Sequence, residues 1–206
     1  KYHISGTFSQ PSANNYNFQV KPDSLVLNYD PWTVNQNNLI QLLNGDIVAN
    51  QFVLSKGVQQ LSLNSFGSGT NRPLSIDFKN FKIATLTALI QTDSVLVDGE
   101  LNGNVLLKNY KTQPTFTSDL VINNLSIYKD TLGNVTAQVI NTTPNVYNAN
   151  IVLTGRGNDL KASGVYYVKP GNNSNFDFAL DIKTLQMKAL EGPSFGAIRN
   201  ASGSLS

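Results

Sequence analysis

Apolar and polar residues alternate with a period of two along most of this 206-residue chain. Short apolar runs recur from end to end, and Gly, Asn, Pro or Asp bounds each of them. This pattern predicts strands with one apolar face, and the lack of helical segments between them favours antiparallel pairing. The predicted strands are 2–8, 16–20, 24–29, 39–43, 46–49, 52–54, 61–63, 95–97, 104–107, 120–122, 125–128, 135–139, 151–153, 160–168 and 176–182.

The connections between these runs carry recognisable turn residues. Asn44-Gly45 favours a tight hairpin, because both residues accept positive φ angles. Asp30-Pro31-Trp32 is predicted to end the strand 24–29, and Asn123-Asn124 is interpreted as a turn. Only residues 84–91 have helical spacing, which predicts one short helix.

The stretch 76–101 returns in degenerate form near the end of the chain. At a shift of 104 positions, the residues Phe78, Phe81, Ile83, Leu86, Gly99 and Leu101 meet Ile182, Leu185, Met187, Leu190, Gly203 and Leu205. Residues 51–67 match 150–166 at a shift of 99. We therefore predict two repeats of about 100 residues, at about 20–101 and 120–206, within one elongated β-repeat segment spanning 1–206.

Both copies share a break in the alternation. Apolar residues skip to a spacing of three at Phe81 and at Leu185, and then alternate again. Such a skip moves the apolar residues to the other face of a strand unless one extra residue is absorbed. A β-bulge or corner is therefore predicted at each of these positions.

Composition narrows the function classes. The chain has no Cys, which excludes disulfides and thiolate metal sites, and its 27 Asn residues predict many short turns. The net charge is +2 with scattered basic residues, so nucleic acid is not an expected partner. No apolar run is long enough to span a bilayer. Neither an initiator Met nor a leader precedes Lys1, which suggests an excised or processed chain.

Candidate chemistry is sparse, and no enzyme activity, metal or cofactor is expected. His3 is the only His. A glycoside hydrolase pair drawn from Asp93, Asp98 and Glu100 is the weakest hypothesis, because closeness in sequence is poor evidence for such a pair and solvated turn carboxylates explain these residues better. The motif 155–159, Gly-Arg-Gly-Asn-Asp, suits a hairpin turn better than an anion or calcium site. Trp32 is either a carbohydrate platform or a plug at a strand end.

The aliphatic strand faces have the most functional potential. They form either a closed core or an open hydrophobic trough, and the sequence does not separate these alternatives. The candidate groove or core positions are Leu25, Leu27, Leu61, Leu63, Ile76, Phe78, Phe81, Ile83, Val105, Leu107, Leu120, Ile122, Leu153, Phe178, Leu180, Leu185 and Met187.

Seven segments in order carry a family resemblance. They are NYDPWTVNQNN (28–38), FVLSKG (52–57), PLSIDFKNFKIATL (73–86), VDGELNGNVLLKN (97–109), PTFTSDLVINNLSI (114–127), TGRGNDLKASGVY (154–166) and LDIKTLQMKALE (180–191). Together they resemble the TamB proteins, a branch of the AsmA-like bridge family, especially those of Bacteroidetes.

The resemblance implies an all-β, elongated antiparallel sheet folded into a taco-like groove. It implies a periplasmic protein held in the inner membrane by an N-terminal anchor, which residues 1–206 do not include. Phospholipid would be the cargo and a BamA-like outer-membrane barrel of the TamA type the partner, with a role in outer-membrane protein assembly. The alternative is a surface adhesin or glycan-binding β-sandwich that uses Trp32 and the tyrosines.

Overall fold

The computed structural model describes residues 2–90, 97–128, 130–169, 174–194 and 197–206. Strands dominate, and the elements in order are β1 (Gly6–Ser12), β2 (Asn15–Val20), β3 (Leu25–Leu27), β4 (Asp30–Val34), β5 (Leu39–Leu43), β6 (Asp46–Asn50), β7 (Phe52–Lys56), β8 (Gln59–Ser65), β9 (Leu74–Lys82), α1 (Ile83–Ile90), β10 (Val97–Lys108), β11 (Thr115–Ile127), β12 (Asp130–Thr143), β13 (Val146–Gly155), β14 (Asn158–Tyr167), β15 (Asn175–Gln186), the 3-10 helix η1 (Met187–Leu190) and β16 (Ser204–Leu205).

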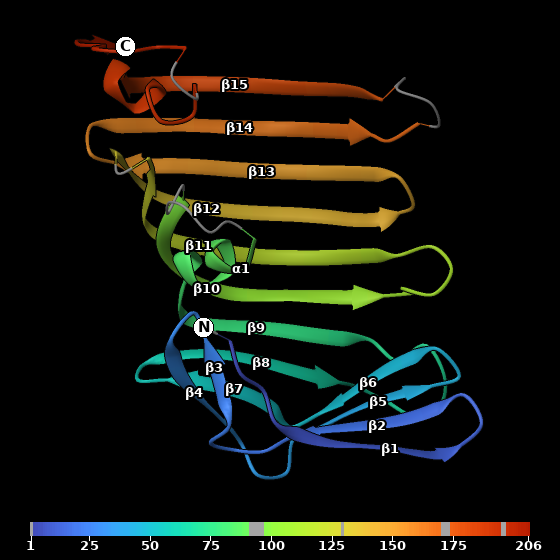
Figure 1. The fold of residues 1–206 in the computed structure, drawn as a ribbon. Coiled ribbons are helices and arrows are strands. Elements are labelled where there is room, and N and C mark those ends of the chain that lie inside the picture. Colours follow the sequence, from blue (N-terminus) through green and yellow to red (C-terminus); the bar gives the residue numbers. More distant parts are fainter. Residues whose placement is uncertain (1, 91–96, 129, 170–173, 195–196) are drawn as a thin grey trace. The chain divides into compact units, whose positions relative to one another are not determined.

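The strands form two antiparallel sheets that are not closed into a barrel (Figure 1). One has four strands in the order β1-β2-β5-β6. The other has twelve, in the order β16-β15-β14-β13-β12-β11-β10-β9-β8-β7-β4-β3. Almost every strand therefore lies beside its neighbour in sequence. The prediction of an all-β, antiparallel fold is confirmed.

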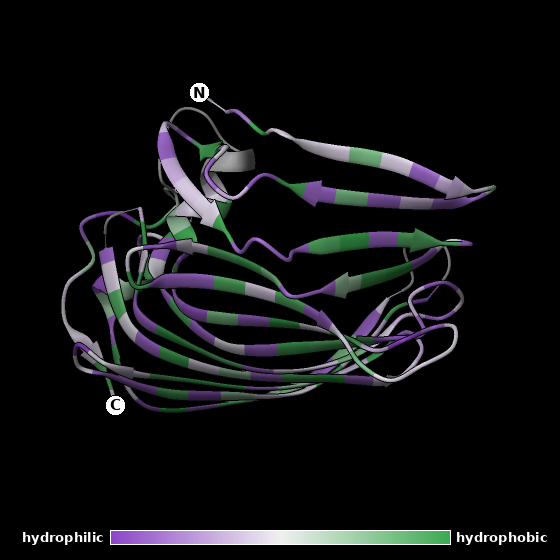
Figure 2. Cartoon of the chain, turned by 90° about the horizontal axis from the view of Figure 1, so that it is seen from below, coloured by the Kyte–Doolittle hydropathy of each residue, from purple (hydrophilic) through white to green (hydrophobic). Residues whose placement is uncertain are grey.

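The contacts divide the chain into two compact units. Unit 1 comprises 1–81 and 103–116, and unit 2 comprises 82–102 and 117–206. In each unit the strands alternate hydrophobic and hydrophilic residues along their length (Figure 2).

An aromatic cluster forms the core of unit 1. Trp32 and Phe81 are both almost fully buried, and their ring centroids lie 5.7 Å apart. The ring of Phe78 meets Phe81 edge-on at 5.9 Å. Trp32 also pairs with Leu25 across β3 and β4. Trp32 is thus a buried plug, and it is not available at the surface for stacking on a sugar.

Polar side chains tie the loops of unit 1 together. The buried Asp46 carboxylate accepts a hydrogen bond from the backbone N–H of Asn71 at 2.9 Å and lies 3.1 Å from the Lys111 ammonium. The hydrogen bond from Asn71 and the charge of Lys111 hold the pKa of Asp46 below its usual value, against the opposing effect of burial. The Tyr110 hydroxyl donates to the Ile47 carbonyl at 2.7 Å. Burial, followed by the nearby Asp46 charge, raises the pKa of Tyr110.

Several local predictions are confirmed. Asn44 and Gly45 have φ angles of 49° and 85° and connect β5 to β6, as expected for the tight hairpin. The predicted helix is α1. The bulge before Leu185 appears as a register shift in the β14–β15 pairing, where Leu160 faces Ile182 but Asp159 faces Thr184. In the other copy Asn80 has a φ of 47°, and Phe81 remains against Phe78.

Three local expectations were wrong. Asp30-Pro31-Trp32 does not end a strand but lies in β4, which pairs with β3. Asn123-Asn124 is not a turn between strands but part of β11, where Asn124 has a φ of 51° and its N–H bonds to the Asn134 side chain. Asn therefore acts there as an irregularity within a long strand. The alternation also does not resume after Phe81 and Leu185, because Ile83 begins α1 and Met187 begins η1.

The two stretches matched at a shift of 104 show the same order of elements. β9 runs into α1 and then β10, while β15 runs into η1 and then β16. In the upstream match, Leu54 pairs with Leu61 in unit 1, and Leu153 pairs with Leu160 in unit 2. The repeat itself stays an interpretation of the sequence that is compatible with this order.

Candidate functional site: the apolar face of β12 to β15

Strands β12, β13, β14 and β15 of unit 2 lie side by side and pair without interruption over most of their length (Figure 1). Residues directly opposite each other in an antiparallel pair project from the same face of the sheet. The pairing registers therefore determine which side chains share a face. We call the side that carries Leu153, Ile151 and Leu180 the apolar face.

The apolar face is organised in rows across the four strands. The members of each row follow from the register, and they are Val135–Leu153–Leu160–Ile182, then Ala137–Ile151–Ala162–Leu180, then Val139–Ala149–Gly164–Phe178, and finally Tyr147–Tyr166–Phe176 on three strands. All of these residues are apolar or aromatic except Gly164, which has no side chain. Every row of this face therefore contains apolar or aromatic side chains.

The opposite face is mainly polar. Its rows include Thr136–Val152–Lys161–Asp181 and Gln138–Asn150–Ser163–Ala179. A sheet with one apolar and one polar face requires cover on the apolar side only. The sequence pattern of β12 to β15 therefore produces a two-sided layer in which only the apolar face avoids water.

On the apolar face, side chains on β13 are buried or half-buried, whereas most of those on β15 are exposed. At the end nearest η1, Leu153 is 8% exposed. Two rows further along, Phe178 is 42% exposed, and Phe176 beyond it is 72% exposed. Leu180 between these ends is 62% exposed. Within unit 2, the described residues thus bury one end of the apolar face and leave the β15 side of the other end in contact with solvent.

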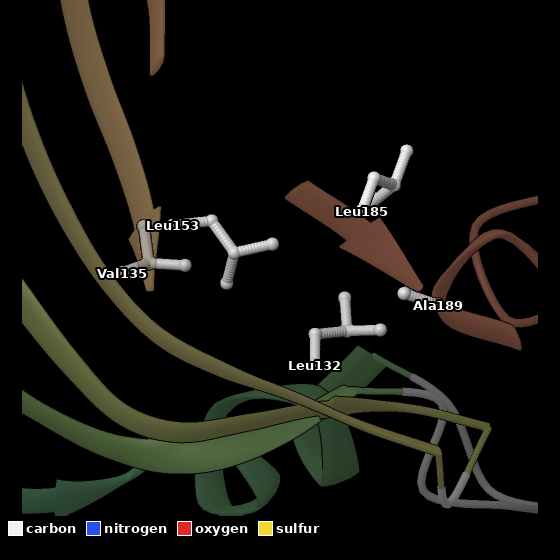
Figure 3. Close-up of a cluster of buried hydrophobic side chains, with 5 residues drawn as sticks. All are labelled: Leu132, Val135, Leu153, Leu185 and Ala189. Carbon is white, nitrogen blue, oxygen red and sulfur yellow. The ribbon is translucent and has the colours of Figure 1, made fainter. Parts of the chain in front are cut away.

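The buried end is a small hydrophobic core. Side chains from β12, β13, β15 and η1 converge there, namely Leu132, Val135, Leu153, Leu185 and Ala189 (Figure 3). Ile122, Ile151, Leu160 and Ile182 are partly buried and pack against this core. It anchors the turn of η1 to the sheet and closes this end of the apolar face.

The exposed end is aromatic. The rings of Phe176 and Phe178 lie 6.2 Å apart on β15, and those of Tyr147 and Tyr166 lie 6.3 Å apart on β13 and β14. Gly164 lies directly opposite Phe178. A Cβ at Gly164 would approach the Asp177 carbonyl oxygen to 2.0 Å, so the close approach of β14 and β15 requires glycine.

A polar pocket of about 370 Å³ lies beyond the buried end, at the hairpin turn between β13 and β14. Arg156 at the turn and Lys188 in η1 supply positive charge to its lining, and Asp130 supplies a negative charge. Lys188 and Asp130 are 3.9 Å apart. The turn residues Arg156 and Gly157 have φ angles of 56° and 81°, which confirms the predicted hairpin at 155–159.

Asn158 fixes the wall of this pocket. It is 4% exposed, its side-chain amide donates to the Leu132 carbonyl at 2.7 Å, and its side-chain oxygen accepts from the Gln186 N–H at 2.8 Å. It therefore connects β12, β14 and β15 at one point. These bonds satisfy a buried polar side chain and hold the pocket lining in place.

The structure separates the predicted groove positions by exposure. Leu25, Phe81, Leu153 and Leu185 are buried core residues. Phe178 and Leu180 are exposed on the apolar face. The half-buried positions are Leu27, Leu61, Leu63, Ile76, Phe78, Ile83, Val105, Leu107, Leu120, Ile122 and Met187.

Pairing brings some of these positions together. In unit 1, Leu61 lies opposite Phe78 and Leu63 opposite Ile76. In unit 2, Leu153, Phe178 and Leu180 share the apolar face. The prediction missed the other members of that face, which are Val135, Ala137, Val139, Tyr147, Ala149, Ile151, Leu160, Ala162, Tyr166, Phe176 and Ile182. Strict alternation through 146–155 and 158–167 is the signal that could have found most of them.

The structure gives no geometric support for a catalytic pair drawn from Asp93, Asp98 and Glu100. Asp98 accepts a hydrogen bond from the Gly99 N–H, and Glu100 accepts one from the Asn102 side chain, so both carboxylates bond to near neighbours in β10. Asp93 lies outside the described residues. In the part of the chain that the structure describes, no group of three or more His, Asp or Glu is arranged to hold a metal ion.

In comparisons with known proteins, no family model, no curated protein and no solved structure matches this chain. Among the described residues, no helix combines the length and the apolarity that a membrane-spanning helix requires.

Proposed function

We propose that this chain is a non-enzymatic lipid-binding segment that shields phospholipid acyl chains on the apolar face of β12 to β15. The observation that carries the proposal is the combination of a continuous apolar face with high exposure of Leu180, Phe178 and Phe176. Exposed apolar surface of this kind marks a site of interaction with another apolar surface.

The dimensions of the apolar face suit an acyl chain. From Phe176 to Ile182 the strand advances six residues, or about 20 Å at about 3.4 Å per residue. Half the hydrocarbon thickness of a bilayer is about 15 Å, so one extended acyl chain fits along β15. The four strands span about 14 Å across at about 4.8 Å spacing, which gives width for neighbouring chains.

The energetics suit a transfer role without chemistry. Moving a sixteen-carbon chain from a bilayer into water costs on the order of 13 kcal/mol, at about 0.8 kcal/mol per methylene. An apolar protein face removes the contacting side of the acyl chain from water and lowers this cost in proportion to the area that it covers. The sequence resemblance to the TamB proteins supports placing this role in the periplasm, between the inner and outer membranes, with a BamA-like barrel as partner.

Leu180→Asp tests the proposal directly. A carboxylate at this position would lie against the bound acyl chain without a partner, which costs more than the 1.4 kcal/mol of a tenfold change. We expect at least tenfold less phospholipid to be captured from phosphatidylethanolamine vesicles, measured by native mass spectrometry. Because Leu180 is 62% exposed in the free chain, the fold should remain intact by circular dichroism.

Gln138→Asp is the matched control. Gln138 is exposed on the polar face, so this variant carries the same charge change on the other side of the sheet. It should capture lipid as the wild type does. Equal capture by Leu180→Asp, or no capture by the wild type, would contradict the proposal. Selective binding on a glycan array without lipid capture would favour the adhesin alternative instead.

A further inference from the structure

The lining of the pocket at the β13–β14 turn suits an anion, which the apolar face does not. Arg156 is exposed at the turn and lines the pocket, and it has no ion-pair partner among the described residues. A guanidinium group presents several N–H donors in a planar fork, which matches the oxygens of a phosphate group. The pocket thus offers an anion an unused donor set.

A second cation lies beside Arg156. Lys188 also lines the pocket, and its contact with Asp130 is long at 3.9 Å with the ammonium side chain 70% exposed. An exposed ion pair of this length contributes little stability, so the ammonium can turn to a stronger acceptor at small cost. Asp130 is the one carboxylate among the lining residues, so two positive charges and one negative charge give the lining a net charge of +1.

The pocket walls are fixed before any ligand arrives. Buried Asn158 bonds to Leu132 and to Gln186, and Gln186 in turn donates to the Gly157 carbonyl at 3.4 Å. Ala189 belongs both to the pocket lining and to the hydrophobic core of unit 2. A volume of about 370 Å³ lies within the range of small-molecule sites. A ligand therefore meets a preformed wall and a lining that includes two cations.

We propose that this pocket binds a phosphate group through Arg156 and Lys188. Two sources share this chemistry, the phosphodiester of a lipid headgroup and free phosphate. The inference does not depend on the proposed function, because a water-soluble phosphate compound needs no apolar face.

Isothermal titration calorimetry with glycerophosphoethanolamine and with inorganic phosphate tests the proposal. Arg156→Asn removes the guanidinium and leaves an Asn-Gly turn, which suits the positive φ angles at both positions, so the hairpin should persist. We expect this variant to bind at least tenfold more weakly. Lys188→Gln removes the ammonium group instead and should weaken binding severalfold. Lys161→Gln is the control, because it removes one positive charge on the polar face of β14, away from the pocket lining.

The two probes distinguish the sources. Binding of glycerophosphoethanolamine points to a lipid headgroup, while binding of inorganic phosphate alone points to the free ion. No heat of binding with either probe, or equal binding by Arg156→Asn and the wild type, would overturn the proposal. Leu180→Asp should bind both probes normally, so failure of the lipid-capture proposal and failure of this one give different results.

Discussion

Leu153 and Leu180 lie on the same face of unit 2, in adjacent rows and two strands apart. Even so, Leu153 is only 8% exposed, whereas Leu180 is 62% exposed. Replacing each by Ala deletes the same atoms. Leu153 packs with Val135, Leu132 and Leu185, so its truncation leaves a cavity. The expected loss of unfolding free energy is about 2–5 kcal/mol.

Leu180→Ala should cost much less. Complete burial of a Leu side chain contributes about 1.5–3 kcal/mol. Because most of Leu180 is already exposed to water, we expect Leu180→Ala to lower the unfolding free energy by about 1 kcal/mol or less. With a urea m-value of about 2 kcal/mol/M, the midpoint should fall by about 1 M or more for Leu153→Ala and by about half of that or less for Leu180→Ala.

Urea titration followed by far-UV circular dichroism measures both midpoints. Tryptophan fluorescence is a poor probe for this test, because the single Trp of the chain lies in unit 1. Equal losses for the two variants would refute the reasoning, since they would mean that the exposed end of the face is closed core in solution. A loss well below 1 kcal/mol for Leu153→Ala would show that the cluster at η1 contributes little to stability.

Two further predictions concern other parts of the fold. The pKa of Asp46 is lowered in the folded chain, so its contribution to stability is present above the unfolded value near 3.8 and is lost as pH falls through the lower folded value. Acid titration of urea midpoints should therefore show a smaller decline below about pH 5 for Asp46→Asn than for the wild type, and parallel declines would count against the contacts with Asn71 and Lys111. Gly164→Ala should lower unfolding free energy by about 1–3 kcal/mol, because its Cβ would meet the Asp177 carbonyl at 2.0 Å, and a thermal midpoint equal to that of the wild type would contradict this close approach.

The sequence predicted those features that depend on neighbouring residues. Asn44-Gly45 determines its own hairpin, and the spacing of three before Leu185 reports a bulge because side chains alternate with a strict period of two. The prediction of a turn at Asn123-Asn124 was wrong because a positive φ angle, which Asn accepts in a turn, also occurs at an irregularity inside a strand. The prediction at Pro31 was wrong because a proline is tolerated near the start of a strand, and β4 pairs with β7 only from Thr33 onward, so the missing N–H of Pro31 breaks no bond to β7.

The candidate site was only partly accessible from sequence. The alternation of apolar and polar residues shows which residues share a strand face, but the exposure of that face depends on what packs over it. The core at η1 buries Leu153 and leaves Leu180 in water, and no local pattern distinguishes these two leucines. The pocket unites a turn, a 3-10 helix and the start of β12, so its lining emerges only when three distant segments meet.

The pairing of each strand with its neighbour in sequence has a consequence for folding and for evolution. In β12 to β15 every strand pairs with a strand next to it in sequence, so little loop entropy opposes pairing, and the hairpins can add one after another as the chain emerges from the ribosome. Duplicating or deleting one hairpin changes the strand count by two and preserves the direction and facing of every other strand. A protein of this design can thus change its length by gene duplication without inventing a new topology.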